Sequence, residues 1–222
     1  MNFTRYGVYF TPSDAGFVQA AAEWLGWDIV AGADIAAPVP HLVERPQKYG
    51  FHATLKPPFR LAPQTSEDGL HRAVRTLATQ LAPVPLGAMA VSQIGRFFAF
   101  TCAQPNDALQ ALAATVVRDL DTFRAEATEE EIAKRLHPGL SETQVQYVHN
   151  WGYPHVMECF RFHMTLTGPV PKGEAPDVVN QIDRHFADTL PQSTTLDALS
   201  LVAERPDGKF VLLERVPLTG MA

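Results

Sequence analysis

The sequence predicts an α+β fold, and three observations predict it. Apolar residues recur at helical spacing in some segments and alternate as in strands in others, so helices and strands are mixed along the chain. Turn residues connect neighbouring strand segments into hairpins, which excludes a purely parallel sheet. The chain has 222 residues, 46% of them hydrophobic, and can bury one sizeable core or two small ones.

The first half of the chain is expected to alternate strands with helices. The elements are a strand over 3–11, a helix over 14–25, a long connection over 28–48, a strand over 49–56 and a helix over 66–81. Ser13 is the expected cap of the first helix, and Gly26 is expected to end it. The dipeptide Pro57-Pro58 is expected to stop the second strand, because proline lacks the N–H that a sheet requires.

The second half contains the strongest local signals. Two capping boxes, Thr128 with Glu131 and Ser141 with Gln144, open two short helices. The remaining elements are strands over 86–94 and 96–103 joined at Gly95, a helix over 109–123 capped by Asn106 or Asp107, a strand over 159–167, a helix over 176–190 and a hairpin of 194–202 with 209–216.

Composition and charge exclude several functional classes. The 18 Lys and Arg against 24 Asp and Glu give a net charge of −6, which argues against a protein that coats nucleic acid by charge. Cys102 and Cys159 form no disulfide framework and cannot complete a zinc site alone. The sequence shows no signal peptide and no long apolar run, so we expect a cytoplasmic protein that does not contact membranes.

Two copies of one strand motif lie half a chain length apart. Residues 49–55 and 160–166 share an aromatic-His-x-Thr-Leu pattern. Because side chains alternate along a strand, the histidine and the threonine of each copy share one face. These residues are His52 and Thr54 in the first copy and His163 and Thr165 in the second. The paired motif predicts two strands that present matching polar groups to one cleft.

Cations and an aromatic residue accompany the motifs. By the same alternation, Lys56 shares the face of the first motif and Arg161 shares that of the second. Residues 45–60 contain four basic side chains and no acidic one. We also consider Arg5 and Tyr153 as substrate-binding residues, although an ion pair for Arg5 and a core position for Tyr153 explain them equally well.

These groups match the needs of phosphate-ester cleavage. One histidine can accept a proton from the attacking water while another donates one to the leaving oxygen. Hydroxyls and cations can hold the non-bridging oxygens. A metal site of His149, His155 and His163 is the rival interpretation, but their spacing differs from that of helical ligand pairs, and we expect neither a metal nor a cofactor.

At these residues the sequence resembles the two-histidine (2H) phosphoesterases, which include 2′-5′ RNA ligase-like proteins and cyclic phosphodiesterases. The resemblance is closer to the branch named for phosphonate metabolism. It covers most of the chain, and its main segments are Arg5-Tyr6, residues 49–61, Phe123-Arg124-Ala125, Gln144, residues 151–154 and residues 160–168. The resemblance implies two pseudo-symmetric lobes, each an antiparallel sheet with helices outside, with the active-site cleft between them.

The expected function is metal-independent hydrolysis of a cyclic phosphate or phosphodiester by a single bilobal domain over residues 1–222. The expected partner is a small phosphorylated substrate, with RNA possible but not favoured by the net charge. Two alternatives remain open: a module that binds a phosphorylated ligand or RNA end without turnover, and an RNA-processing enzyme. The sequence does not determine which histidine is the acid, nor the oligomeric state.

Overall fold

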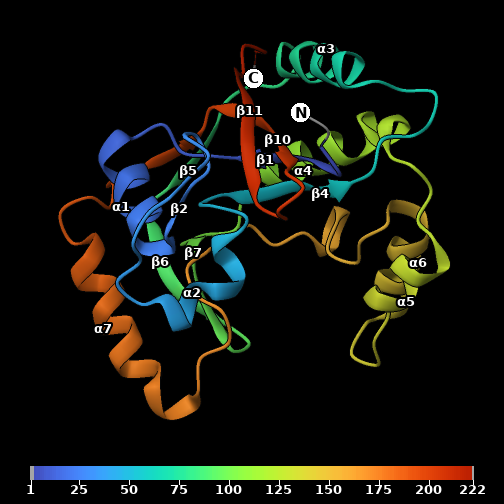
Figure 1. Ribbon diagram of the computed structural model, residues 1–222. Helices are drawn as coiled ribbons and strands as arrows, with labels where there is room; N and C mark the ends of the chain where they lie inside the picture. The colour runs from blue at the N-terminus through green and yellow to red at the C-terminus, as the bar shows by residue number, and fades with distance from the viewer. Residues whose placement is uncertain (1–2, 222) are drawn as a thin grey trace.

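A seven-stranded antiparallel sheet organises the molecule (Figure 1). The computed structural model describes residues 3–221. From one edge to the other the strands are β11 (Phe210–Pro217), β10 (Ala198–Glu204), β1 (Tyr6–Phe10), β4 (Ala53–Phe59), β8 (Met164–Thr165), β7 (Phe97–Cys102) and β6 (Met89–Ile94). Two short sheets pair β2 (Trp27–Asp28) with β3 (Ala33–Asp34) and β5 (Val84–Gly87) with β9 (Thr194–Leu196). The predicted α+β class is therefore confirmed.

Helices accompany the large sheet, and most of them cover one of its faces. They are α1 (Ala15–Leu25), α2 (Pro40–Gln47), α3 (Glu67–Ala78), α4 (Asp107–Asp119), α5 (Glu129–Arg135), α6 (Glu142–Trp151) and α7 (Ala175–Phe186), with 3₁₀ turns η1 (Asp121–Phe123), η2 (Met157–Cys159) and η3 (Lys172–Glu174). The main core joins apolar side chains of α1, α3, α4 and α7 to every second residue of the strands, such as Tyr6, Val8 and Phe10 of β1. The alternate residues of these strands are thus directed to the opposite face.

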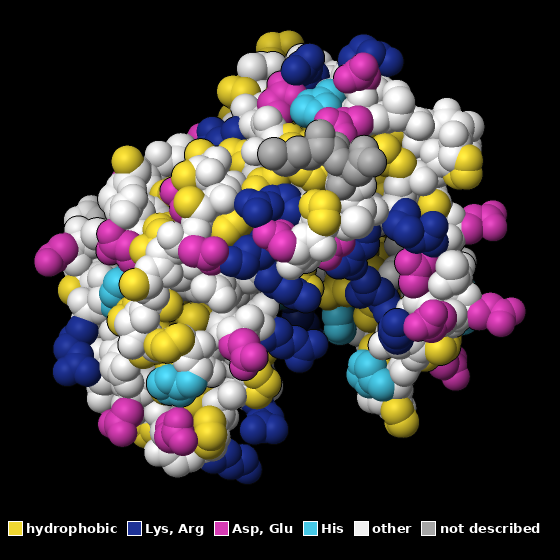
Figure 2. All heavy atoms as spheres, in the orientation of Figure 1, with side chains coloured by type: hydrophobic (Ala, Val, Ile, Leu, Met, Phe, Trp, Pro, Cys, Tyr) yellow, Lys and Arg dark blue, Asp and Glu magenta, His cyan; other side chains and the backbone are white. Residues whose placement is uncertain are grey.

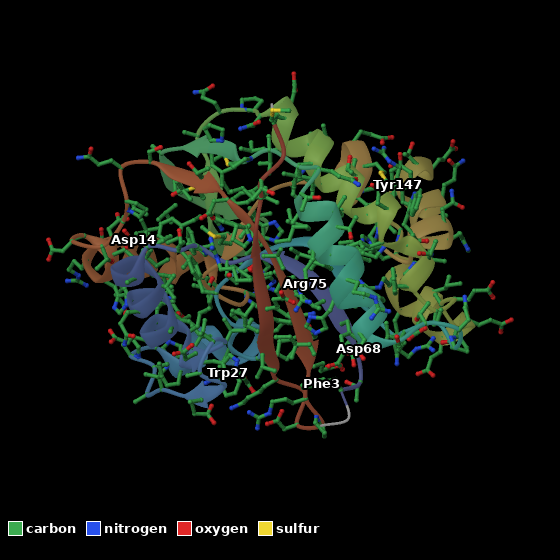
Figure 3. The ribbon with its side chains drawn as sticks, turned by 90° about the horizontal axis from the view of Figure 1, so that it is seen from above. Phe3, Asp14, Trp27, Asp68, Arg75 and Tyr147 are labelled. Carbon is green, nitrogen blue, oxygen red and sulfur yellow. The ribbon has the colours of Figure 1, made fainter. Side chains whose placement is uncertain are left out.

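Helices α5 and α6 form an arm at one end of the molecule. Seen from above, α6 with Tyr147 lies at the end opposite to α1, whose N-cap is Asp14 (Figure 3). The capping boxes at Thr128 and Ser141 are both present, and Gly152 ends α6, as predicted. Within residues 3–221 no helix has the length and apolar character needed to cross a membrane.

The two predicted lobes correspond to two halves of one continuous sheet. Strands β11, β10, β1 and β4 form one half, and β8, β7 and β6 form the other. The halves meet at a single residue pair, Ala53 with Met164. This short pairing keeps the sheet continuous. Each half carries one copy of the motif next to it.

Local signals placed most elements correctly, with corrections at several of them. Asp14, not Ser13, caps α1, because its carboxylate accepts the Phe17 N–H at 2.8 Å. The expected connection over 28–48 contains the β2–β3 hairpin and α2, which begins at a proline that suits the first turn of a helix. The expected strand over 159–167 is ordered as a strand only at Met164–Thr165.

Strand β4 also differs from its predicted range. It begins at Ala53 and runs through both prolines to Phe59. Beyond its single pair with β8, the strand pairs with β1 only, and the register pairs on either side of the prolines are Lys56 with Val8 and Phe59 with Tyr6. The two prolines therefore lie where the strand has a neighbour on one side, which is where a sheet tolerates them.

Candidate active site

The pairing of Ala53 with Met164 brings the two motifs together. Both residues are buried in the main core, so their neighbours along each strand face the uncovered side of the sheet. The antiparallel register sets His52 beside Thr165 and Thr54 beside His163. In agreement, His52 and Thr165 line one hollow, Thr54 and His163 line the adjoining one, and Phe97 lines both. The repeated motif predicted that these four residues share one cleft; the structure brings them together on one face of the sheet, in two hollows that have Phe97 in common.

The two imidazoles are held in the same way. The Nδ1 atom of His52 lies 2.9 Å from the Gly50 carbonyl oxygen, and that of His163 lies 2.8 Å from the Arg161 carbonyl oxygen. A carbonyl can only accept, so each Nδ1 is the donor. In the neutral form of each ring, Nε2 therefore carries the lone pair and can exchange a proton with a substrate. Both motifs thus present a correctly oriented Nε2.

His52 is additionally fixed by two contacts. Its ring stacks on that of Tyr9 with centroids 3.8 Å apart and planes inclined by 18°. Its Nε2 lies 3.0 Å from the Thr54 hydroxyl, which donates to it in the neutral ring. Burial, together with the nearby charge of His163, lowers the pKa of His52 to about 4 although the Gly50 carbonyl acts in the other direction. His52 is therefore neutral at physiological pH and can accept a proton.

Two glycines make this arrangement possible. Gly50 has a φ of +67°, and a Cβ there would lie 2.6 Å from the Cβ of Ile29. A glycine at position 50 is therefore needed to place its carbonyl where it accepts the Nδ1–H of His52. A Cβ on Gly7 would lie 3.1 Å from Cε1 of Tyr9, so the glycine leaves room for the tyrosine ring that stacks on His52. Tyr9 was not predicted as a site residue, because its stacking partner is 43 residues away and only the β1–β4 register joins them.

The structure corrects the expected position of Lys56. The register between β1 and β4 shifts after Thr54, which pairs with Tyr9, so that Lys56 pairs with Val8 on the helix-covered face. Its ammonium group donates to the Val117 carbonyl at 3.0 Å and to Asp121 at 2.8 Å, and its side chain is only 2% exposed. Burial is the main cause that lowers its pKa, and Asp121 opposes it. Lys56 cannot contact a ligand at the motifs.

The other three candidates lie around the site. Arg161 and Tyr153 line the same hollow as Thr54 and His163. Arg5 lies farther along the same face and forms an ion pair with Glu204, with two N···O distances of 2.6 Å. The ion-pair interpretation of Arg5 therefore holds, and the residue also lines an adjoining pocket.

A metal-binding cluster is not found among residues 3–221, where no three His, Cys, Asp or Glu side chains are grouped to hold an ion. His155 lines the hollow of His163 and receives a hydrogen bond from Gln144, whose amide nitrogen lies 3.1 Å from Nδ1. His149 lies exposed in the last turn of α6. The three histidines weighed as a metal site thus do not converge.

Paired His-x-Thr motifs in antiparallel register on one sheet face are the arrangement that the resemblance to the two-histidine phosphoesterases implies. The chain belongs to the DUF1045 family, described as a protein family of unknown function, whose model matches residues 54–211. These findings agree with the resemblance inferred from the sequence.

Curated relatives extend the comparison. The chain is 35% identical over 236 residues to a protein of Janthinobacterium sp. (strain Marseille) and 32% identical over 219 residues to one of Laribacter hongkongensis (strain HLHK9), both named ribose 1,5-bisphosphate phosphokinase PhnN. The matches cover 99% and 96% of this chain but 52% and 51% of the relatives. The chain therefore spans about half the length of the curated relatives it matches.

Solved structures of similar architecture are more distant. E. coli LigT complexed with 3′-AMP matches with a TM-score of 0.47 and 15% identity, over 98% of this chain and 99% of the other. Usb1 of Kluyveromyces marxianus matches with a TM-score of 0.39 and 12% identity, again over 98% and 99% of the two chains.

Proposed function

We propose that this chain hydrolyses a cyclic phosphate ester of a sugar by acid–base catalysis between His52 and His163, without a metal ion. The observation that carries the proposal is the cross-strand register, which presents two Nδ1-anchored imidazoles and two threonine hydroxyls to one side of the sheet. A cyclic phosphate needs a base on one side of phosphorus and an acid on the other.

His52 is the proposed general base, because burial keeps its ring neutral at physiological pH. Its Nε2 takes a proton from water as the water oxygen bonds to phosphorus. The bond from phosphorus to one ring ester oxygen breaks, and Nε2 of His163 gives its proton to that oxygen. The product is a phosphomonoester with a free sugar hydroxyl, and proton exchange with solvent restores both histidines.

The threonines would bind the non-bridging oxygens during this step. Once a water molecule occupies Nε2 of His52, the hydroxyl of Thr54 is free to donate to a phosphate oxygen. Thr165, beside His52 across the strand pair, can contribute a second hydroxyl. Hydrogen bonds that strengthen as charge develops on these oxygens lower the barrier.

The proposed substrate is a ribose cyclic phosphate. The curated relatives, which are about twice as long, are named for a kinase that acts on ribose 1,5-bisphosphate. Opening a cyclic phosphate on a ribose phosphate yields a ribose bisphosphate, so this hydrolysis would supply a molecule of the kind in that name. This supports a role in phosphonate metabolism, in line with the branch that the sequence resembles.

A turnover screen with EDTA present tests the proposal, using ribose cyclic phosphates, 2′,3′-cyclic nucleotides and 2′-5′-linked dinucleotides. His52→Ala and His163→Ala should each lower kcat/KM by about 10²–10⁴-fold, and the double variant by much less than the product of the two. His149→Ala, at an exposed histidine, is the control and should be unchanged.

The possible outcomes separate the alternatives. Near-wild-type turnover after loss of either histidine would refute the two-histidine mechanism. Activity that EDTA abolishes and zinc or manganese restores would favour a metal enzyme. Tight binding of a cyclic phosphate with no turnover would favour a binding module, and cleavage of the 2′-5′ dinucleotides alone would favour RNA processing.

A further inference from the structure

A second pocket adjoins the proposed catalytic face, and its lining is strongly basic. The basic pocket has a volume of about 400 Å³. Its charged lining residues are Arg5, Arg60, Arg124, Lys134, Arg135 and one carboxylate, Glu131. Figure 2 shows the molecule hollowed between the arm and the rest of the protein, with Lys and Arg side chains along both walls. This concentration of positive charge contrasts with the net charge of −6 of the whole chain.

The register places the basic pocket on the same face as the histidines. Tyr6 and Val8 of β1 point into the main core, so Arg5 and Tyr9 point to the other side. The pair of Tyr6 with Phe59 sets Arg5 beside Arg60 on the neighbouring strand. Tyr9 lies four positions after Arg5, which corresponds to about 13 Å along the strand. Because an arginine side chain is long, the guanidinium of Arg5 can lie closer to the histidines than its backbone does. A small sugar phosphate can then span the distance between them.

The guanidinium groups of the basic pocket are oriented from behind by carboxylates. Arg5 is paired with Glu204, Arg60 with Glu131, and Arg124 with Asp121. Lys134 is likewise paired with Glu130. These pairs hold four of the five basic groups and leave Arg135 to be considered.

Arg135 is the cation available for a ligand. In the part of the chain that the structure describes, it has no carboxylate partner. Its guanidinium lies over the ring of Tyr153, 4.7 Å from the centroid. Tyr153 in turn lines the hollow of Thr54 and His163, so Arg135 stands at the junction of the basic pocket and the catalytic face.

An unsatisfied hydroxyl lies beside His52, in the interior of the protein. Tyr9 is fully buried, and its hydroxyl has no hydrogen-bond partner among the described residues. Burial is the main cause that raises the pKa of Tyr9; Tyr49 acts in the same direction and Arg5 opposes it. The ring of Tyr9 stacks on that of His52, so this residue supports the proposed base and is not part of the lining of the basic pocket.

We infer that the basic pocket binds a second phosphate group of the substrate, with Arg135 as its principal ligand. The enzyme would then prefer a cyclic phosphate whose sugar also carries a separate phosphomonoester. Several guanidinium groups at one place favour a doubly charged, multidentate phosphate over a carboxylate. This inference rests on the proposed function, since it describes the far end of the same substrate.

The test compares matched substrate pairs with and without the second phosphate. Suitable pairs are ribose 1,2-cyclic phosphate with its 5-phosphate, and adenosine 2′,3′-cyclic phosphate with its 5′-phosphate. Arg135→Gln should lower the ratio of kcat/KM for the phosphorylated over the plain member by about 10–100-fold, the effect of removing a charge-assisted hydrogen bond. Arg135→Lys should restore part of the ratio.

Arg118→Gln is the matched control. Both arginines lie in the last turn of a helix, and Arg118 is exposed on α4, where its guanidinium donates to the Thr115 hydroxyl at 3.3 Å. An unchanged ratio in Arg135→Gln, or an equal loss for both members of a pair, would overturn the inference, because the latter is the result of a structural defect.

A binding measurement separates this inference from the proposed function. Calorimetric titration with ribose 5-phosphate needs no turnover, and Arg135→Gln should weaken its binding at least about tenfold relative to wild type and to Arg118→Gln. If wild type turns over no cyclic phosphate, the proposed function fails while this titration still decides the pocket. Equal affinities of wild type and Arg135→Gln, or no binding to wild type, would refute the second-phosphate site.

Discussion

Gly50→Ala tests whether the backbone before the first motif orients His52. The new Cβ would lie 2.6 Å from Cβ of Ile29 and 3.3 Å from its two γ carbons, so the backbone or the isoleucine must move. The left-handed φ of +67° adds a penalty of its own. Because the Gly50 carbonyl accepts the Nδ1–H of His52, any backbone movement also turns the imidazole.

The magnitude follows from these two contributions. A left-handed conformation costs a non-glycine residue about 1–2 kcal/mol, and overpacking a buried position costs about 1–3 kcal/mol. We therefore expect Gly50→Ala to lower the free energy of unfolding by about 2–5 kcal/mol. Gly208→Ala is the matched control, because Gly208 also has a positive φ, of +82°, but a Cβ added there would meet no atom within 4 Å. This control should lose only the first contribution.

Urea unfolding of both variants measures the difference, and nitrogen NMR of the His52 ring reports its Nδ1 hydrogen bond independently of any substrate. We also expect turnover per folded molecule to fall by about 10²-fold in Gly50→Ala, the effect of a displacement near 1 Å. Equal unfolding free energies for the two variants would refute the steric argument. A destabilised Gly50→Ala with an unchanged His52 spectrum would refute the orienting role of the carbonyl.

Two further predictions concern ionisable groups. The pKa of His52 is lowered to about 4 from an ordinary 6.5. Between these pH values the imidazole is protonated in the unfolded chain but neutral in the folded protein, so the free energy of unfolding decreases as the pH drops from 6.5 to 4. Urea unfolding at pH 7 and 4.5 gives the loss of unfolding free energy between the two pH values, and His52→Gln should make this loss smaller by up to about 3 kcal/mol. An equal loss in the variant and in wild type would contradict the prediction. Lys56→Met should destabilise by about 1–3 kcal/mol, because Asp121 keeps only Arg124 as a partner. The KM of this variant should not change. A raised KM would show that Lys56 contacts the substrate and would contradict its assignment to the core.

Local sequence signals determined most of the fold. The capping boxes at Thr128 and Ser141, the Asn106 cap of α4 and the turn at Gly95 each depend on residues within a few positions of one another. The short elements within residues 28–48 carried no such periodicity, since prolines begin and interrupt α2. The extent of a strand depends on its partners, and these come from distant parts of the chain.

The site was predictable where it rests on alternation and not where it rests on register. His52, Thr54, His163 and Thr165 follow from the repeated motif and from the period of two along a strand. Alternation failed for Lys56, because the register shift after Thr54 turns it to the helix-covered face. No pattern in the sequence indicates such a shift, and none links Tyr9 or Arg135 to the motifs.

The two motif strands begin later than the sequence predicted, and this explains how the imidazoles are anchored. Strand β4 begins only at Ala53 and β8 only at Met164, so the carbonyls of Gly50 and Arg161 lie outside the strand pairing. Had either strand extended three residues further, to Gly50 or Arg161, that residue's carbonyl could be engaged in the sheet ladder, which would compete with its hydrogen bond to the histidine two positions later. The same offset occurs in both motifs, although their surroundings differ. At the junction between the two halves of the sheet, one residue pair joins the strands, and a carbonyl beside each strand orients an imidazole. The proposed acid–base chemistry requires side chains held in fixed positions in this way.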